Sequence, residues 1–545
     1  MMEKAQEFRA LPNPTDADLL HSEVDIKGAN SAVEPQNTYD GDEDQLARLG
    51  KKQVLKRSFG FWSTLGFSCA LLITWEGQLS VFTTGLSNGG PAGLIYGFII
   101  VWIGTLCVFT TLSELASMAP TAGGQYHWVA MLAPKSSQKI LSYITGWLTV
   151  LGWQAQIASA SYLTGTTIQG VVILTCPSYD PQRWHGTLLA WAVVICGLGI
   201  NTLVSSILAK IETLILILHI VAFVAILIPL VFLGPHSSPQ EVFTVFTNAG
   251  GWPTQGLSFF VGLVGPVFAF LGTDGAIHIS EEVRNAAIIV PRSMILSVLI
   301  NGTLGFGMLL AMVFCLGNID TISSTPPTQY PFMAVFAQAV GSNSGGAGMV
   351  AVIIFMYVCA TTTSLASSSR MTWSFARDRG LPFSEHLSRI NRRTSLPLYP
   401  IFLTAVFTCL LALINIGSSV AFNDVISLTV GGLYSSYLIC CTLLLWRRCT
   451  GGIGGSSQDT AQKTGLHWGP FRIPGVLGIA VNIVACAFVI IVIFFSFWPP
   501  ATPTTAESMN YSVLVFGGII LFSIAYYLTI AHRTYLGPLT EVEVR

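Results

Sequence analysis

Apolar and polar positions alternate along this chain on the scale of whole helices rather than single residues. From residue 58 onward, long apolar runs follow one another with short polar segments between them. About 20 apolar residues cross the hydrocarbon core of a bilayer as one α-helix. The pattern therefore predicts an all-α polytopic membrane protein with about 12 transmembrane helices. The predicted helices lie at 58–86, 91–118, 138–172, 185–206, 209–233, 255–281, 291–317, 347–376, 397–416, 419–446, 474–498 and 511–532.

Composition agrees with this prediction and argues against several other classes of protein. Of the 545 residues, 52% are hydrophobic and 10% are charged, whereas soluble domains carry about 25% charged residues. A net charge of −1 provides no basic face for nucleic acid. The sequence has no Walker A motif, no Gly-x-Ser-x-Gly elbow and no His/Cys/Asp cluster with metal-ligand spacing. We therefore expect no enzyme, no cofactor and no metal.

The distribution of basic residues predicts the orientation in the membrane. When the 26 Lys and Arg residues are sorted over twelve helices, all but Arg183 fall on the side of the N-terminus. Basic residues are enriched in cytoplasmic segments of membrane proteins. Because the helix number is even, we expect both termini in the cytoplasm.

Two acidic residues lie near the middle of predicted helices. Glu76 and Asp274 are each followed by glycine, in the first and sixth helices. An acidic side chain at mid-bilayer costs about 2.5–3.5 kcal/mol on insertion scales, so it usually faces a cavity or a partner. Glycine-interrupted helices at matching positions of two halves point to a transporter site. The alternative for each acid is a buried, protonated side chain that hydrogen-bonds a neighbouring helix.

Other polar residues within the apolar runs have two possible roles. Gln154, Thr361 and Thr362, with Gln156 and Ser364 close to them in the same helices, either line a substrate pathway or connect packed helices. His219 is more often a satisfied core histidine than a proton relay. Glu212 begins the fifth helix beside a lysine and is expected to form a pair at the membrane surface. Asn510-Tyr511-Ser512 is a glycosylation sequon in a predicted outer loop.

Four motifs resemble those of the amino acid–polyamine–organocation (APC) superfamily. They are Ser113–Tyr126, Gly272–Ala286 with Val290-Pro291-Arg292, Ser87–Pro91 and Ala376–Pro382. The second motif is most similar to the fungal branch that contains GABA permeases and choline permeases. The resemblance extends over about residues 55 to 530.

The resemblance implies a LeuT-like fold of five-plus-five inverted repeats and two extra helices. We expect a disordered cytoplasmic N-terminal tail (1–55), a transport core of helices 1–10 (56–446), a cytoplasmic loop (447–473), helices 11 and 12 (474–532) and a cytoplasmic C-terminal tail (533–545). The family places its substrate at breaks in helices 1 and 6. On this chain, these positions are Ile73, Thr74, Trp75, Glu76, Gly77, Phe270, Leu271 and Gly272, with Phe268 as the aromatic cap.

The first break departs from the family pattern, in which a glycine-rich run grips a substrate carboxylate. Here Trp75 and Glu76 add bulk and negative charge. Glu76 would repel a carboxylate and attract an ammonium group, with Trp75 available for a cation–π contact. Three substrate classes remain open: a cationic amine such as choline or a polyamine, GABA or another amino acid, and an alkaloid or specialised metabolite, whether imported or exported.

The resemblance further implies proton-coupled import, with Glu76 or Asp274 as the proton-coupling residue. The expected partners are a small amine or amino acid, protons and the lipid bilayer. The plasma membrane is the expected location, and the vacuolar membrane is the alternative. A nutrient sensor that binds without translocation is a different functional class. No feature of the sequence predicts an oligomeric state.

Overall fold

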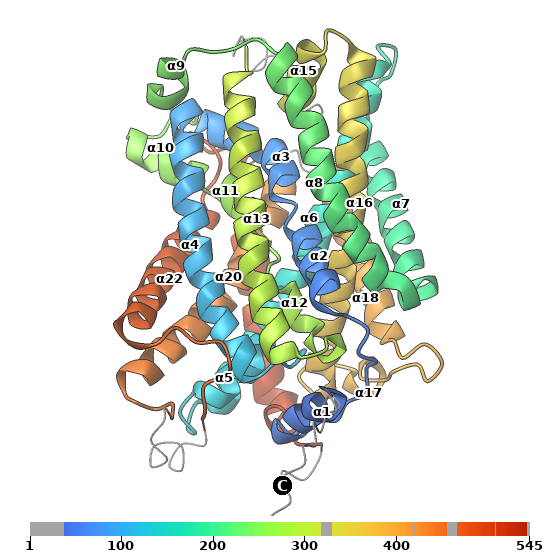
Figure 1. Ribbon diagram of the computed structural model, residues 1–545, viewed down its shortest axis with the longest axis vertical. Helices are drawn as coiled ribbons and strands as arrows, with labels where there is room; N and C mark the ends of the chain where they lie inside the picture. The colour runs from blue at the N-terminus through green and yellow to red at the C-terminus, as the bar shows by residue number, and fades with distance from the viewer. Residues whose placement is uncertain (1–37, 318–329, 418–420, 455–465, 507, 542–545) are drawn as a thin grey trace, which may run out of the picture. The chain divides into compact units, whose positions relative to one another are not determined.

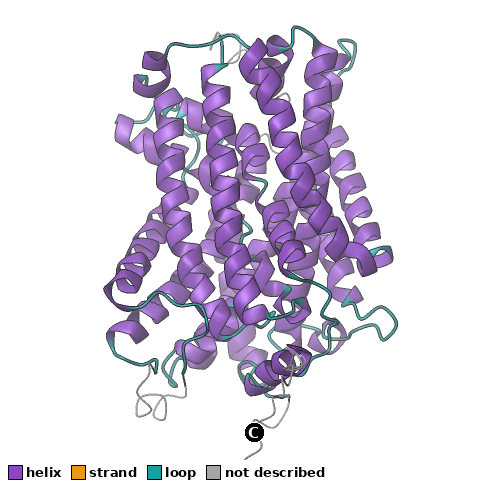
Figure 2. Cartoon of the chain, viewed as in Figure 1, coloured by secondary structure: helices purple, strands orange, loops and turns teal. Residues whose placement is uncertain are grey.

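A computed structural model describes residues 38–317, 330–417, 421–454, 466–506 and 508–541 (Figure 1). These residues form helices and loops and contain no β-strand (Figure 2). Eleven of their helices are long and apolar enough to cross a membrane. A shorter apolar stretch, Gln255–Ala269, accounts for the sixth predicted block. The prediction of an all-α polytopic membrane protein is confirmed.

The bundle consists of helices that match the predicted apolar blocks. Several begin at proline, whose missing N–H falls in the first turn, where no intrahelical acceptor exists; Pro91 in the first turn of one helix is an example. The unbroken long helices are α4 (Gly90–Met118), α6 (Gln138–Thr175), α7 (Arg183–Leu203), α8 (Leu208–Leu233), α13 (Ala286–Phe314), α16 (Asn343–Arg377), α20 (Ala421–Cys449) and α22 (Gly475–Ser496). Two further blocks are α18 (Leu398–Ala412) with α19 (Ile414–Gly417), and α23 (Ser512–Tyr526) continued by a π-helical turn (Tyr527–Ala531) and α24 (His532–Thr534).

The first predicted helix is broken into α2 (Phe61–Leu72) and α3 (Thr74–Ser87). Ile73 joins them with φ 35° and ψ 48°, a left-handed conformation that costs an L-residue roughly 1–2 kcal/mol. Its N–H still donates to the Cys69 carbonyl at 2.9 Å. The Thr74 N–H is held by Asn301 Oδ1 at 3.1 Å. The break therefore lies within the predicted stretch, at its isoleucine rather than at its glycine.

The sixth predicted helix is divided into α10 (Gln255–Gly262), α11 (Val264–Ala269) and α12 (Gly275–His278). Between α11 and α12, Gly272 has φ 102°, a conformation that favours glycine. The two broken helices pack closely, because a Cβ on Gly265 would lie 3.2 Å from the Val81 carbonyl oxygen. Figure 1 shows α3 and α11 side by side in the middle of the bundle.

Short helices at the two ends of the bundle were not predicted from the apolar runs, because each is far below membrane-spanning length. They are α1 (Thr38–Arg48), α5 (Gln125–Leu132), α9 (Pro239–Thr244), α15 (Pro331–Ala339) and α17 (Ser384–Leu387). In Figure 1, α1, α5 and α17 lie at one end and α9 and α15 at the other. We call these the α1 end and the α9 end.

The predicted disorder of residues 1–55 is wrong for the part that the structure describes. Residues 38–55 contain α1, and Leu46, Lys51 and Leu55 are each at most 3% exposed. Lys51 pairs with Asp378 of the bundle. Residues 1–37 lie outside the described residues.

The expected C-terminal tail also packs onto the bundle. The Leu539 N–H donates to Asp378 Oδ1 at 3.0 Å, and the Lys52 N–H donates to Glu541 Oε2 at 2.9 Å. The Glu541 N–H reaches the Gly50 carbonyl at 2.6 Å. We call Gly50–Lys52 together with 535–541 the terminal clasp, because these two segments hold one another at the α1 end.

Candidate functional site

A small pocket lies where the two broken helices meet. Its empty volume is about 390 Å³. The residues that line it come from four parts of the fold: Leu71, Leu72, Ile73 and Gly77 around the first break, Phe268, Ala269 and Leu271 around the second, Gln156, Ala160 and Leu163 on α6, and Tyr357, Ala360 and Ser364 on α16. No charged side chain is among them.

The predicted substrate-binding residues divide into two groups. Ile73, Gly77, Phe268 and Leu271 line the pocket, whereas Thr74, Trp75, Glu76, Phe270 and Gly272 do not. The helical period explains the division along α3, because successive side chains point about 100° apart. Because Gly77 faces the pocket, the side chains of Trp75 and Glu76 point in other directions.

Glu76 and Trp75 both face α8 instead of the pocket. Glu76 Oε1 lies 2.9 Å from His219 Nδ1, and both side chains are fully buried. The Trp75 ring lies 6.0 Å from the His219 ring and 6.0 Å from that of Phe223. Trp75 is therefore not placed for a cation–π contact with a solute in this pocket. His219 thus has an acidic partner, Glu76, that could not be identified from local sequence patterns because the two residues are 143 positions apart.

Asp274 follows the second break, directly before α12, and neutral donors hold its carboxyl group. Its Oδ2 accepts from Gln125 Nε2 at 2.8 Å and from Trp153 Nε1 at 3.1 Å. His278 Nε2 is 3.6 Å away. Gln125 begins α5, so this carboxyl connects the second break to the α1 end.

Three of the residues predicted to line a pathway form hydrogen bonds within the bundle instead. Gln154 Nε2 donates to Thr372 Oγ1 at 3.1 Å and to Thr404 Oγ1 at 3.0 Å. The Thr361 and Thr362 hydroxyls each donate at 2.9 Å to the backbone carbonyl one turn earlier in α16. None of the three lines the pocket.

Three polar side chains do line the pocket: Gln156 and Ser364, which the sequence also offered as candidates, and Tyr357. Gln156 is two residues beyond Gln154, and Ser364 belongs to the same hydroxyl-rich run as Thr361. Among the described residues, Gln156 Oε1 and Ser364 Oγ have no hydrogen-bond partner. Tyr357 gave no signal in the sequence, because a single aromatic residue in an apolar run is ordinary.

Glu212 is deeply buried, contrary to the expected surface pair. It is 0% exposed, and the Thr363 hydroxyl donates to its Oε1 at 2.9 Å. The prediction failed because α8 turns this side chain toward α16.

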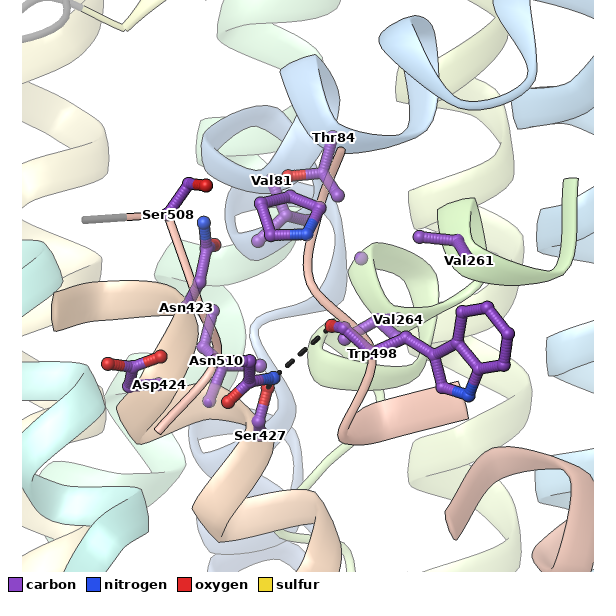
Figure 3. A pocket seen from close by; sticks show the side chains of 13 residues that line it. Val81, Thr84, Val261, Val264, Asn423, Asp424, Ser427, Trp498, Ser508 and Asn510 are labelled. Carbon is purple, nitrogen blue, oxygen red and sulfur yellow. Dashed lines mark hydrogen bonds between the residues drawn. The ribbon is translucent and has the colours of Figure 1, made fainter. Parts of the chain in front are cut away.

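A second pocket continues the seam between the broken helices toward the α9 end (Figure 3). Its empty volume is about 500 Å³, and Val81, Thr84 and Val264 line one side. Val81 and Thr84 follow Gly77 on one face of α3, at spacings of four and seven residues. The Phe268 ring stands edge-on to that of Phe422 at 5.8 Å, next to the lining residues of this pocket.

Several buried ion pairs occupy the α1 end, and we call the members of four of them the ionic cluster. These four pairs are Lys51–Asp378, Arg377–Glu281, Arg370–Glu282 and Arg448–Glu114. Burial alone would raise the pKa of the Glu281 carboxyl, but the Arg377 charge and hydrogen bonds, with the Ala122 N–H, outweigh burial and lower it. The motifs that carry the family resemblance supply all three glutamates.

The predicted glycosylation of Asn510 is contradicted by its surroundings. Asn510 is 3% exposed. Its Nδ2 donates to Ser427 Oγ at 2.9 Å, to the Ser496 carbonyl at 3.1 Å and to the Trp498 carbonyl at 3.3 Å (Figure 3). The nitrogen that a glycan would occupy is therefore enclosed and engaged.

We expect Asn510 to carry no glycan in the mature protein. Treatment with an N-glycosidase should leave electrophoretic mobility unchanged, while a known glycoprotein in the same membranes shifts. Asn510→Asp should lower stability by about 1–3 kcal/mol, because it places an acceptor against acceptor oxygens. A glycosidase-sensitive band that Asn510→Asp abolishes would contradict this expectation.

Comparison with known proteins agrees with the architecture. The sequence profile described as amino acid permease matches residues 59–520. A choline transporter of Saccharomyces cerevisiae is 31% identical over 476 residues, which cover 87% of this chain and 81% of that protein. A Macrophomina phaseolina protein named as an amino acid/polyamine transporter is 30% identical over 82% of this chain and 96% of its own length. The Arabidopsis thaliana amino-acid permease BAT1 is 29% identical over 92% of this chain and 97% of its own length.

These matches extend over most of the chain and include both helix breaks and the ionic-cluster motifs. The relatives are permeases rather than enzymes. The chain therefore belongs to the amino acid permease family of the APC superfamily, and it is a multi-pass membrane transporter.

Proposed function

We propose that this protein is a secondary active, proton-coupled importer of a small nitrogen-containing solute. The observation that carries the proposal is the junction of two broken helices at one pocket in the middle of the bundle. Backbone groups freed by such breaks have no partner in lipid, so they must face protein, water or a solute. A pocket at this junction provides that solute with partners.

The helix ends around the pocket support binding of a zwitterion. Asn301 holds the Thr74 N–H and Ile73 accepts from the Gly77 N–H, but the N-terminus of α3 still carries partial positive charge, which favours a carboxylate. The last carbonyl groups of α2 and α11 carry the opposite partial charge and favour an ammonium group. Leu72, Ile73 and Ala269 of these ends line the pocket. We therefore favour GABA or another amino acid as the substrate.

A choline-like amine is the second candidate. The choline transporter among the relatives favours it, and the aromatic rings of Phe268 and Tyr357 line the pocket. An aromatic face attracts a quaternary ammonium group. Glu76, by contrast, is turned toward His219 and offers the pocket no charge.

The two ends of the bundle support alternating access. The seam between α3 and α11 runs from the pocket toward the α9 end, while the ionic cluster closes the α1 end. Transport would require these pairs to separate. We propose, from the distribution of basic residues, that the α1 end is cytoplasmic, with both termini there and the protein in the plasma membrane.

Uptake measurements test this function directly. Radiolabelled GABA, choline and leucine would be offered, at two pH values, to yeast that lack their own permeases. We expect saturable uptake of one probe, with a higher rate at acidic pH. Absence of uptake, with the protein verified at the cell surface, would contradict import and favour export of a specialised metabolite or sensing.

Ala160→Phe should abolish uptake, because a phenyl group on this wall of α6 fills the small pocket. Its matched control is Ile173→Phe, which places the same group on the same helix away from the pocket. Both variants are compared at equal surface abundance. Unchanged uptake by Ala160→Phe would show that the solute binds elsewhere.

A further inference from the structure

The pair Glu76–His219 is a buried acid–base contact between α3 and α8. The 2.9 Å separation of Oε1 and Nδ1 is a hydrogen-bond distance, and both side chains are 0% exposed. Among the described residues, neither Glu76 Oε2 nor His219 Nε2 has a hydrogen-bond partner. Each side chain thus contacts the other through one polar atom, and its second polar atom has no hydrogen-bond partner.

The groups around this pair carry no formal positive charge. The titratable side chains that face it are Cys69 from α2, and Tyr357 and Cys359 from α16. On α8 itself, Glu212 lies two turns before His219. None of these is a Lys or Arg that would hold Glu76 permanently ionised. Among the described residues around Glu76, the His219 imidazole is the group that can balance the charge of a carboxylate, and it does so when it is protonated.

We propose that Glu76 and His219 together form the proton-carrying site of this transporter, an inference that rests on the proposed function. With one proton shared, the pair has zero net charge, whichever atom holds that proton. Losing the proton leaves one buried negative charge and gaining a second leaves one buried positive charge, both of which are costly in an apolar setting. One shared proton is therefore the arrangement that leaves no net charge in this buried contact.

Movement of α3 links this proton to transport. Glu76 lies in the first turn of α3, the half-helix that begins directly after the left-handed Ile73. His219 lies in the middle of the unbroken α8. If α3 rotates or tilts about its break, the two side chains separate and the proton loses its second partner. A proton that binds one arrangement better than the other biases the equilibrium between them.

The substrate does not need to touch this site. Neither Glu76 nor His219 lines the pocket. Tyr357 does line it, and its hydroxyl donates to the Glu76 backbone carbonyl at 2.6 Å while contacting Ser80 Oγ at 2.6 Å. One side chain thus connects a bound solute to the backbone of the proton-carrying residue.

Asp274, the other candidate, is tied to elements other than α3 and α8. Two neutral donors, Gln125 and Trp153, hold its Oδ2. We therefore assign Asp274 to connecting α5, α6 and the second break.

Proteoliposomes separate proton coupling from substrate translocation. Purified wild type, Glu76→Gln and His219→Gln would be assayed with radiolabelled GABA, choline and leucine in two modes. Accumulation against a gradient, driven by an imposed pH difference, requires proton movement. Counterflow against unlabelled internal solute does not. We expect accumulation by each variant to fall about tenfold, within the range of coupling between linked sites, while counterflow persists.

Two further variants sharpen the test. Glu212→Gln removes a different fully buried carboxyl, which lies on α8 and accepts from the Thr363 hydroxyl, and it should keep pH-driven accumulation. Glu76→Asp keeps a titratable group at the site, so it should shift the pH profile of accumulation rather than flatten it. This milder variant also provides the test if the glutamine variants fail to fold.

Each outcome identifies which statement fails. pH-driven accumulation that persists in Glu76→Gln or in His219→Gln overturns the proton-carrying pair and leaves proton-coupled import intact. Loss of counterflow together with accumulation, in both glutamine variants and in Glu76→Asp, would assign the pair to the substrate site and also overturn the inference. A wild-type protein that translocates a probe without any pH dependence contradicts both proton coupling and this pair.

Discussion

Asp378→Asn should destabilise the protein by about 3–5 kcal/mol, the cost of removing one partner of a buried ion pair. Asp378 is fully buried and is the partner of Lys51, itself 1% exposed. It also accepts the Tyr126 hydroxyl at 2.7 Å and the Leu539 N–H at 3.0 Å. The substitution leaves the ammonium group without a countercharge and weakens the terminal clasp. Thermal unfolding of the detergent-solubilised protein measures the effect.

Two variants distinguish a buried pair from a general charge effect. Glu385→Gln removes an exposed acid of α17 and should leave the unfolding temperature unchanged. Adding Lys51→Met to Asp378→Asn removes the stranded charge, so the double variant should be more stable than Asp378→Asn alone. Equal unfolding temperatures for Asp378→Asn and wild type would show that this pair contributes no net stability.

Gly152→Val should prevent α6 and α20 from packing. A Cβ on Gly152 would lie 2.8 Å from the Leu433 backbone nitrogen, and a Cβ on Gly432 would lie 2.8 Å from the Gly152 Cα. Backbone atoms cannot rotate away as a side chain can. We expect a cost above the roughly 1–3 kcal/mol of ordinary overpacking, with loss of surface protein and of uptake. The adjacent Trp153, which donates to Asp274, would be displaced as well.

Gly199→Val is the matched control for this prediction. Gly199 also lies within a membrane helix, α7, but a Cβ there meets no atom within 4 Å. We expect normal surface abundance and normal uptake. If the two valine variants behave alike, the close approach of α6 and α20 is not a constraint on folding.

The helix breaks were predictable because polarity and glycine are local signals. Glu76 and Asp274 stand out within apolar runs, and both lie at or beside an observed break. The direction of each side chain was not predictable, since it depends on the residue at which the half-helix begins. Once α3 begins at Thr74, the helical period places Gly77 on the pocket and Glu76 toward α8. Five consecutive residues were therefore predicted as one site, although they face different neighbours.

The ionic cluster shows a different limit of sequence analysis. Glu114 and Arg448 are 334 residues apart, and Lys51 and Asp378 are 327 apart. Local patterns identify each residue as charged, but only the folded bundle pairs them. The same reason explains why Leu46 and Leu55 were assigned to a disordered tail: two leucines in a polar segment carry no signal until a surface exists to cover them.

The terminal clasp constrains where a purification tag belongs. Glu541 is hydrogen-bonded to Gly50 and Lys52, and any peptide joined after Arg545 begins four residues later. Four residues reach at most about 14 Å, so a fluorescent protein fused there would crowd the α1 end. A tag placed before Met1 has 37 residues between it and Thr38, where α1 begins. A difference in transport activity between fusions at the two ends would then reflect disturbance of the clasp rather than a step of the transport cycle.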